Sequence, residues 1–133
     1  MTESGIEFTG IGPDNLQMIP AELIARRRCT QCLHYEDPTF WTGSDPDAIL
    51  ETKKRAWFER VGGSFGVCGH VAREDGRTVA FAEYALPSDF PGLAEYEIEL
   101  DPALPLIVCL VVAQDARDQG VGARLVGVVE ESL

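Results

Sequence analysis

The sequence has few positive charges and no long apolar run. Lysine and arginine number 11 against 22 aspartate and glutamate residues, so the formal net charge is −11. Such a surface repels nucleic acid and anionic membranes, and it favours a cationic ligand such as an amine, although acidity also simply keeps a protein soluble. No apolar run approaches membrane-spanning length. The first residues, MTESGIEF, lack the basic segment and apolar core of a secretory signal, so we expect a cytoplasmic protein.

Cysteine is also scarce, with four residues in the chain. Cys29 and Cys32 form one C-x-x-C pair, while Cys68 and Cys109 stand alone in segments with strand character. A zinc site needs about four ligands, and a second C-x-x-C is missing. The residues that folding would have to add are His34, Cys68 and His70. We therefore predict structural cysteines and no metal site, with a metal or redox protein built on Cys29 and Cys32 as the alternative.

The composition fits one globular domain over residues 1–133. Apolar residues make up 45% and charged residues 25%, which is ordinary for such a domain. The pattern predicts a short strand at 6–8 and a short or broken helix over 16–24. A helix is expected to begin at Ser44-Asp45-Pro46, where capping side chains precede a proline, and to end at Gly62-Gly63. Its apolar face is predicted to comprise Ile49, Leu50, Ala56, Trp57 and Val61.

Two strands at 65–72 and 78–85 are predicted to form an antiparallel hairpin, because Asp75-Gly76 favours the tight primed turns. Alternation places Val79, Phe81, Glu83 and Ala85 on one face and Ala80, Ala82 and Tyr84 on the other. Glu83 and Tyr84 are expected to be hydrogen-bonded or solvated, or to face an acceptor pocket. Residues 87–105 are long for a loop, which is typical of a functional segment, and their Tyr96, Ile98 and Leu100 alternation also suits an extension of the next strand.

The last quarter of the chain carries the strongest pattern. Residues 106–112, LIVCLVV, read as a buried strand, and Val121, Leu125, Val128 and Val129 recur at helical spacing after Gly120 and Gly122. The first N–H groups of a helix lack intrahelical partners and carry its positive dipole end. Glycine lets an anion approach these donors closely, and Arg117 and Arg124 add positive charge. We therefore expect a ligand that contains phosphate.

The segment Arg117-Asp118-Gln119-Gly120-Val121-Gly122 resembles the acyl-CoA motif R/Q-x-x-G-x-G/A of the GNAT N-acetyltransferase superfamily. The G-x-G-x-x-G and P-loop patterns do not fit, because Leu125 stands at the third glycine and no Gly-Lys-Ser/Thr occurs. The segment Cys32-Leu33-His34-Tyr35-Glu36 more loosely resembles a C-x-Y-W-E-like stretch of uncharacterised GNAT-like proteins.

The resemblance implies a GNAT-like α+β fold, with a mixed, mostly antiparallel sheet flanked by helices. It implies that acetyl-CoA is a co-substrate and that its acyl group passes directly to a primary amine. The loop would hold the pyrophosphate and the preceding strand would hold the pantetheine arm, with a Val111 or Val112 amide near the thioester carbonyl. The implied cofactor-binding residues are Leu110, Val111, Val112, Arg117, Asp118, Gln119, Gly120, Val121, Gly122 and Ala123.

The catalytic residues stay unassigned at this stage. Strand 106–112 has no Glu, Asp or His, so the expected base is one of the carboxylates of loop 87–105, which are Asp89, Glu95, Glu97, Glu99 and Asp101. GNAT chains normally continue beyond the helix at which this sequence stops, so we expect a partial GNAT domain. An uncovered edge strand at 106–112 then predicts a homodimer, or completion by another chain. The alternative function is a non-catalytic CoA-binding or interaction module derived from a GNAT domain.

Overall fold

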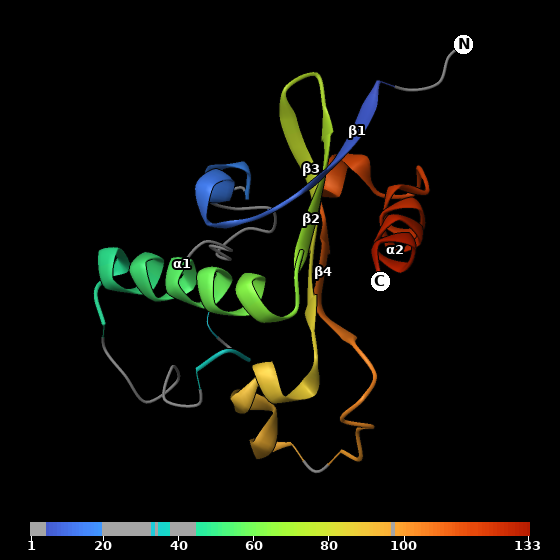
Figure 1. Ribbon diagram of the computed structural model, residues 1–133. Helices are drawn as coiled ribbons and strands as arrows, with labels where there is room; N and C mark the ends of the chain where they lie inside the picture. Colours follow the sequence, from blue (N-terminus) through green and yellow to red (C-terminus); the bar gives the residue numbers. More distant parts are fainter. Residues whose placement is uncertain (1–4, 20–32, 34, 38–44, 97) are drawn as a thin grey trace.

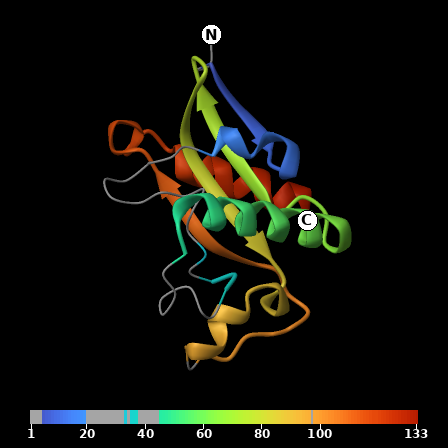
Figure 2. The ribbon, with the colours of Figure 1, turned by 90° about the vertical axis from the view of Figure 1, so that its left-hand side faces the viewer.

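The computed structural model describes residues 5–19, 33, 35–37, 45–96 and 98–133. These residues form one antiparallel sheet in the order β1-β2-β3-β4. The strands are β1 (Ile6–Gly10), β2 (Gly69–Glu74), β3 (Arg77–Ala85) and β4 (Leu106–Val112). Helix α1 (Asp47–Ser64) lies against one face and helix α2 (Val121–Ser132) against the other (Figures 1 and 2). The predicted α+β class and the bounds of the last strand are confirmed.

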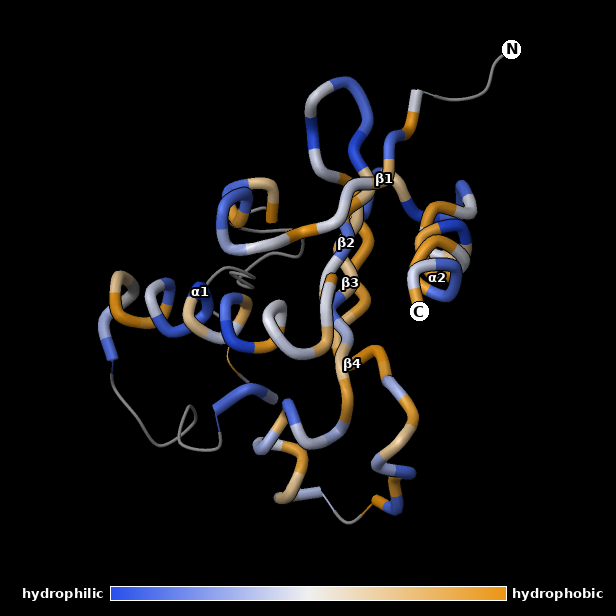
Figure 3. Tube along the Cα trace, in the orientation of Figure 1, coloured by the Kyte–Doolittle hydropathy of each residue, from blue (hydrophilic) through white to orange (hydrophobic). Residues whose placement is uncertain are grey.

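The β2–β3 hairpin turns at Asp75 and Gly76, as predicted. Both residues have positive φ, 52° and 79°, which is the backbone of a type I′ turn. Figure 3 shows that the tip of the hairpin is hydrophilic, while apolar residues gather along the strands between the two helices. The first strand of the hairpin begins at Gly69 and not at Phe65, because Phe65 still donates its N–H to the Val61 carbonyl at 2.7 Å and closes α1.

The face that helix α1 turns to the sheet matches the prediction only in part: Trp57 and Val61 are buried as predicted. Ile49 is 44% exposed and Ala56 is exposed, so neither belongs to the core. The buried residues recur at helical spacing and are Lys54, Trp57, Phe58 and Val61. The helix also runs through Gly62 and Gly63 to Ser64, and its N-cap is Pro46 without a side-chain cap. The prediction considered apolar residues only, and it therefore left Lys54 out of the buried face of the helix.

Strand β3 contributes to two hydrophobic clusters, one on each face of the sheet. Phe81 and Ala85 pack with Trp57, Phe58 and Val61 on the α1 side. The α2 side is built on small residues, and Ala72, Ala80 and Ala82 pack with Val121, Leu125 and Val129. Val79 was predicted to share a face with Phe81, but it packs in the α2 cluster. The pairing shifts there, because Thr78 pairs with Arg73 and Ala80 with Ala72, so Val79 is the extra residue of a β-bulge.

The N-terminal segment and the loop after β3 differ from the prediction in their details. A 3₁₀ helix, Pro13–Met18, takes the place of the first part of the expected helix, and residues 20–24 lie outside the described residues. The loop after β3 contains two short 3₁₀ helices, Pro87–Asp89 and Pro91–Glu95. The alternation of Tyr96, Ile98 and Leu100 does not extend β4, and these three side chains are exposed. Among the described residues, no helix is long and apolar enough to cross a membrane.

Candidate functional site

Strand β4 forms an edge of the sheet. Within the described residues it pairs with β3 alone, so the backbone groups on its other side find no strand there. Its side chains are mostly half-buried rather than buried as predicted, and Leu110 is 45% exposed. Val111 faces the α1 side beside its partner Phe81, whereas Val112 packs with the α2 cluster. The three predicted strand residues of the site therefore lie along an open apolar edge.

The junction from β4 to α2 has the backbone geometry of an anion site. A short 3₁₀ turn, Gln114–Ala116, follows the strand, and Asp118 and Gly120 then adopt left-handed φ values of 68° and 74°. Helix α2 begins directly after Gly120, without a side-chain cap. Among the described residues, the N–H groups of Val121, Gly122 and Ala123 find no hydrogen-bond acceptor. Three donors at the positive end of the helix dipole are thus open to a ligand.

Gly122 explains how the helix start comes so near to the strand. A Cβ built at this position would lie 3.3 Å from Cγ2 of Val112, closer than most side chains tolerate. The second glycine of the motif therefore allows α2 to pack directly on the end of β4. Gly120 has open space around it, so its role is different: its positive φ, which glycine adopts without strain, allows the chain to turn into the helix.

Side-chain hydrogen bonds from Arg77 on β3 and from two residues of the loop itself hold the loop in place. Arg77 at the start of β3 grips Asp115 with two hydrogen bonds of 3.0 and 2.8 Å, and this contact lowers the pKa of the Asp115 carboxyl. Gln119 donates to the Asp115 carbonyl, and Arg117 Nε donates to the Val112 carbonyl, both at 3.3 Å. The exposed Arg117 therefore stays beside the junction, as predicted. Arg124 points elsewhere, because its guanidinium lies 5.2 Å from the centre of the Phe8 ring on β1.

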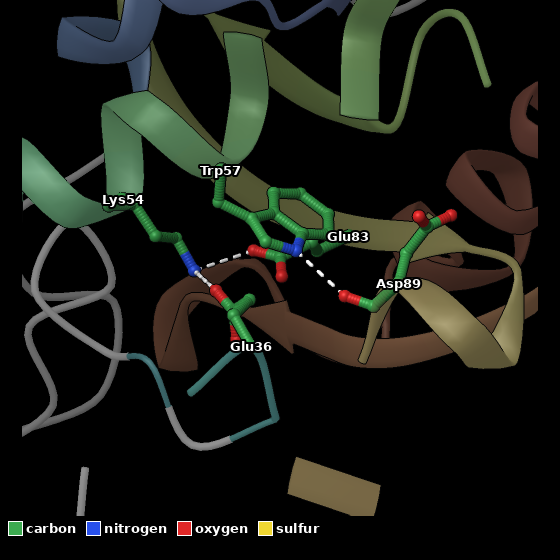
Figure 4. A network of polar contacts seen from close by, with 5 residues as sticks. All are labelled: Glu36, Lys54, Trp57, Glu83 and Asp89. Atoms are coloured by element: carbon green, nitrogen blue, oxygen red, sulfur yellow. Dashed lines mark hydrogen bonds and ion pairs between the residues drawn. The ribbon is translucent and has the colours of Figure 1, made fainter. Parts of the chain in front are cut away.

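A second polar feature lies on the α1 side of the sheet, where three buried ionisable side chains meet (Figure 4). Lys54 of α1 lies 2.6 Å from Oε1 of Glu83 on β3, and its ammonium also contacts Oε2 of Glu36. No side chain of the three is more than 4% exposed. Burial and the Glu36 charge raise the pKa of Glu83 to about 8, although the positive charge of Lys54 acts to lower it. Burial alone would lower the pKa of Lys54, but the two carboxylates outweigh it and raise that pKa.

The cluster of Glu36, Lys54 and Glu83 was not found from the sequence. Glu83 was expected to be hydrogen-bonded, solvated or facing an acceptor pocket, and Lys54 was not singled out. The usable signal was the spacing of Lys54 with Trp57, Phe58 and Val61, which places a lysine on the buried stripe of an amphipathic helix. A buried lysine requires a buried acid, and Glu83 lies on the strand face that this helix covers.

Tyr84 occupies the other face of β3, and its predicted hydrogen bonding is confirmed. Its hydroxyl lies 2.7 Å from Nδ1 of His70 and 3.0 Å from Oγ of Ser132 near the end of α2. Burial raises the pKa of Tyr84 and lowers that of His70. Both rings are buried, so this contact joins the sheet to the last turn of the helix.

The cysteines and the acidic loop complete the predicted candidates. Cys68 and Cys109 are free thiols, and burial raises the pKa of Cys68 to about 12, so it is neutral and unreactive. Cys29, Cys32 and His34 lie outside the described residues, and within these no cluster of metal ligands occurs. In the loop, the Asp89 carbonyl accepts from Nε1 of Trp57 at 2.9 Å and fixes that turn to α1.

A comparison with known families accounts for the junction. The family model described as "Acetyltransferase (GNAT) family" matches residues 30–133. The chain belongs to the GNAT acetyltransferase family. This assignment agrees with the glycine motif and supports acyl transfer as the general activity. No curated protein sequence matches the chain.

Solved structures that are similar to this chain include several acetyltransferases. An aminoglycoside acetyltransferase from an uncultured soil metagenomic sample is 18% identical with a TM-score of 0.53, and the match covers 95% of this chain and 70% of that one. The Chaetomium thermophilum Naa20 structure with a bisubstrate analogue is 16% identical (TM-score 0.48, 95% and 55% covered). The Thermoplasma acidophilum PaiA N-acetyltransferase in complex with coenzyme A is 12% identical (TM-score 0.45, 95% and 70% covered). At this identity the first likeness shows a GNAT-like fold for the chain.

Proposed function

We propose that this GNAT-family chain binds an acyl-CoA at the β4–α2 junction and transfers the acyl group, most simply acetyl, to a primary amine. The observation that carries the proposal is the set of open N–H groups at Val121, Gly122 and Ala123, next to a glycine with φ 74°. A diphosphate suits these donors because it brings negative charge to the positive end of the α2 dipole.

The edge of β4 gives the rest of the ligand a place. A pantetheine arm contains two amide groups, and such groups pair with the free backbone groups of an edge strand in the way that an added strand does. The site residues are then Leu110, Val111 and Val112 for the arm. Those for the diphosphate are Arg117, Asp118, Gln119, Gly120, Val121, Gly122 and Ala123.

The acceptor is proposed to be an amine for a chemical reason. The net charge of −11 attracts a cation over distances of about a Debye length, which raises its local concentration near the protein. The reaction then requires a bound thioester, a neutral amine and a group that removes the amine proton.

Thermal unfolding with and without ligand tests the binding step. Millimolar CoA is expected to raise the melting temperature of the wild-type chain by several degrees, because CoA binds only the folded state. Ala123 is exposed in the first turn of α2, where an acid suits the helix dipole. Ala123→Glu is therefore expected to fold normally and to lose the CoA shift through charge repulsion.

Ala123→Lys is the matched control for that variant. It adds a side chain of similar length with the opposite charge, so it is expected to keep or enlarge the shift. A wild-type melting temperature that does not respond to CoA, or an equal response in both variants, rejects the proposed site. Release of the CoA thiol on addition of primary amines tests the transfer step and separates an enzyme from a CoA-binding module without turnover.

A further inference from the structure

The buried cluster of Glu36, Lys54 and Glu83 has a composition that a purely structural ion pair does not need. One ammonium meets two carboxylates, so with every group ionised the three carry a net charge of −1 away from water. Burying charge is costly, and a third charge that the pair cannot balance adds to that cost. A proton on one carboxylate removes the excess, so the cluster is built to gain and lose one proton.

Three segments of the chain bring these groups together. Lys54 comes from α1, Glu83 from near the end of β3, and Glu36 from the described residues 35–37 (Figure 4). The neighbouring Tyr35 carbonyl accepts from the Gly92 N–H at 2.8 Å, which ties the Glu36 segment to the loop after β3. The position of the carboxylate of Glu83 is therefore fixed from two sides.

Glu83 is also placed next to the edge strand. Its direct partner across the β3–β4 ladder is Cys109, and paired residues of this kind turn their side chains to the same face. The register shifts between Glu83 and Tyr84, because Tyr84 pairs with Ile107 and leaves Val108 as an extra residue. A bulge of this kind redirects backbone N–H and C=O groups and is common beside active sites.

The length of the pantetheine arm of an acyl-CoA brings its thioester close to Glu83. A pantetheine arm is a chain of about twelve bonds, which reaches roughly 14 Å by the dimensions of a peptide backbone. This equals about four residues of strand. Counted back from Ala113 at the loop, the arm ends beside Cys109, further along β4 than the Val111 and Val112 amides. The thioester and the carboxylate of Glu83 are then one strand apart.

Resting on the proposed acyl transfer, we propose that Glu83 accepts the proton of the acceptor amine through one bridging water, and that Lys54 and Glu36 are positioning residues that hold its carboxylate beside the β3–β4 bulge. The acceptor arrives as an ammonium ion and gives one proton to Glu83. The neutral nitrogen forms the C–N bond with the thioester carbon, the C–S bond breaks, and the second amine proton ends on the leaving thiolate as CoA thiol. Glu83 then returns its proton to water.

The groups near Glu83 agree with this role. Burial and the charge of Glu36 raise its pKa to about 8, and Lys54 opposes them. The Cys68 thiol stays neutral, and among the described residues Asp89, Cys109 and Tyr35 are further ionisable groups on the α1 side of the sheet. A carboxylate that binds a proton near neutral pH is a suitable base for an ammonium ion.

The first test measures kcat/KM against pH for the full chain, with acetyl-CoA and a panel of small primary amines. The wild-type rate is expected to rise with pH through an apparent pKa near that of Glu83. Glu83→Gln is expected to lower kcat/KM about 100-fold or more and to remove this rise. The CoA-induced rise in melting temperature is expected to stay, which shows that the proposed binding function survives.

The second test shifts the pH at which kcat/KM rises, and it leaves the proposed base Glu83 in place. Glu36→Gln removes the charge that raises the pKa of Glu83, so the rising part of the pH–rate profile should move to lower pH. Lys54→Met removes the opposing charge, so the rising part should move to higher pH. Opposite shifts from two neighbours distinguish proton transfer from a merely structural role.

Three results would overturn the assignment. One is a Glu83→Gln variant that folds and stays within about threefold of wild-type kcat/KM. Another is a pH limb that neither neighbouring substitution moves. The third is a wild-type chain that binds CoA but releases no thiol with any amine. A wild-type chain that does not bind CoA would instead reject the proposed function itself.

Discussion

Lys54 Nζ lies 2.6 Å from Oε1 of Glu83, in a cluster where no side chain is more than 4% exposed. Removal of the ammonium leaves two carboxylates buried side by side. Lys54→Met is therefore expected to destabilise the fold by about 3–5 kcal/mol. Lys53 is the matched control, because it is the adjacent lysine and forms exposed pairs with Asp37 and Asp45. Urea unfolding should show a large loss for Lys54→Met and almost none for Lys53→Met. Equal losses would contradict the assigned burial.

Stability is expected to fall as the pH rises from about 5 to 8. The pKa of Glu83 is about 8 in the folded chain against an ordinary 4.5, so the folded state binds more protons than the unfolded state in this range. The free energy of unfolding then decreases with pH by at most about 1.4 kcal/mol per unit. His70 acts in the opposite sense near its ordinary value of 6.5, because burial lowers its pKa. The wild type minus Glu83→Gln difference isolates the Glu83 contribution, and a difference that is flat with pH would refute it.

Two glycines of α2 should respond in opposite ways to substitution. Gly127 has open space for a Cβ, so Gly127→Ala is expected to stabilise the chain by about 0.5–1 kcal/mol. Gly122 lies against Val112, so Gly122→Val is expected to push the helix from the strand at a cost of about 1–3 kcal/mol. Thermal melts measure both effects. A neutral Gly122→Val would mean that the helix and strand are not in close contact.

The contact between Tyr84 and His70 predicts a further cost. Tyr84→Phe removes a hydroxyl that bonds to His70 and Ser132 in a buried site, and about 1–3 kcal/mol is expected to be lost. Ser132→Ala removes only one of the two partners at the surface and should cost less. Denaturant midpoints measure both losses of stability. A larger loss for Ser132→Ala than for Tyr84→Phe would contradict the prediction.

One edge of β4 pairs with no strand among the residues that the structure describes, and this edge predicts self-association. We propose that two copies pair through this edge in the absence of ligand, because β4 carries no charge or proline to discourage it. Leu110→Lys places a charge on the exposed apolar face and should shift the mass measured by light scattering from dimer to monomer. A wild-type chain that is monomeric at 100 μM by this method would contradict the proposal.

The sequence predicted the parts of this fold that depend on local pattern. The Asp75-Gly76 turn, the strand at 106–112 and the helix after Gly120 follow from backbone preference and apolar spacing, and all three are present. The face of α1 was predicted only in part and the position of Val79 was predicted wrongly, because a buried lysine and a β-bulge depend on the partners supplied by other segments.

The candidate site divides along the same line. The loop residues were predicted from a contiguous motif, and the structure adds their open N–H groups. The cluster of Glu36, Lys54 and Glu83 joins residues 18 and 29 positions apart, so no local window contains it. Neither the burial of Lys54 nor the direction of Arg124 toward Phe8 can be obtained from spacing alone.

The distance between α2 and the sheet depends on small side chains, the methyl groups of Ala72, Ala80 and Ala82. Because a helix tilts as a rigid rod, a bulkier residue at any of these positions would lift its leading end as well as its middle. The N–H groups at the start of α2, which we propose bind the diphosphate, would then shift, even though the altered residue does not contact the proposed ligand. Ligand affinity in this protein should thus be sensitive to substitutions beneath the helix that a survey of the loop would never include.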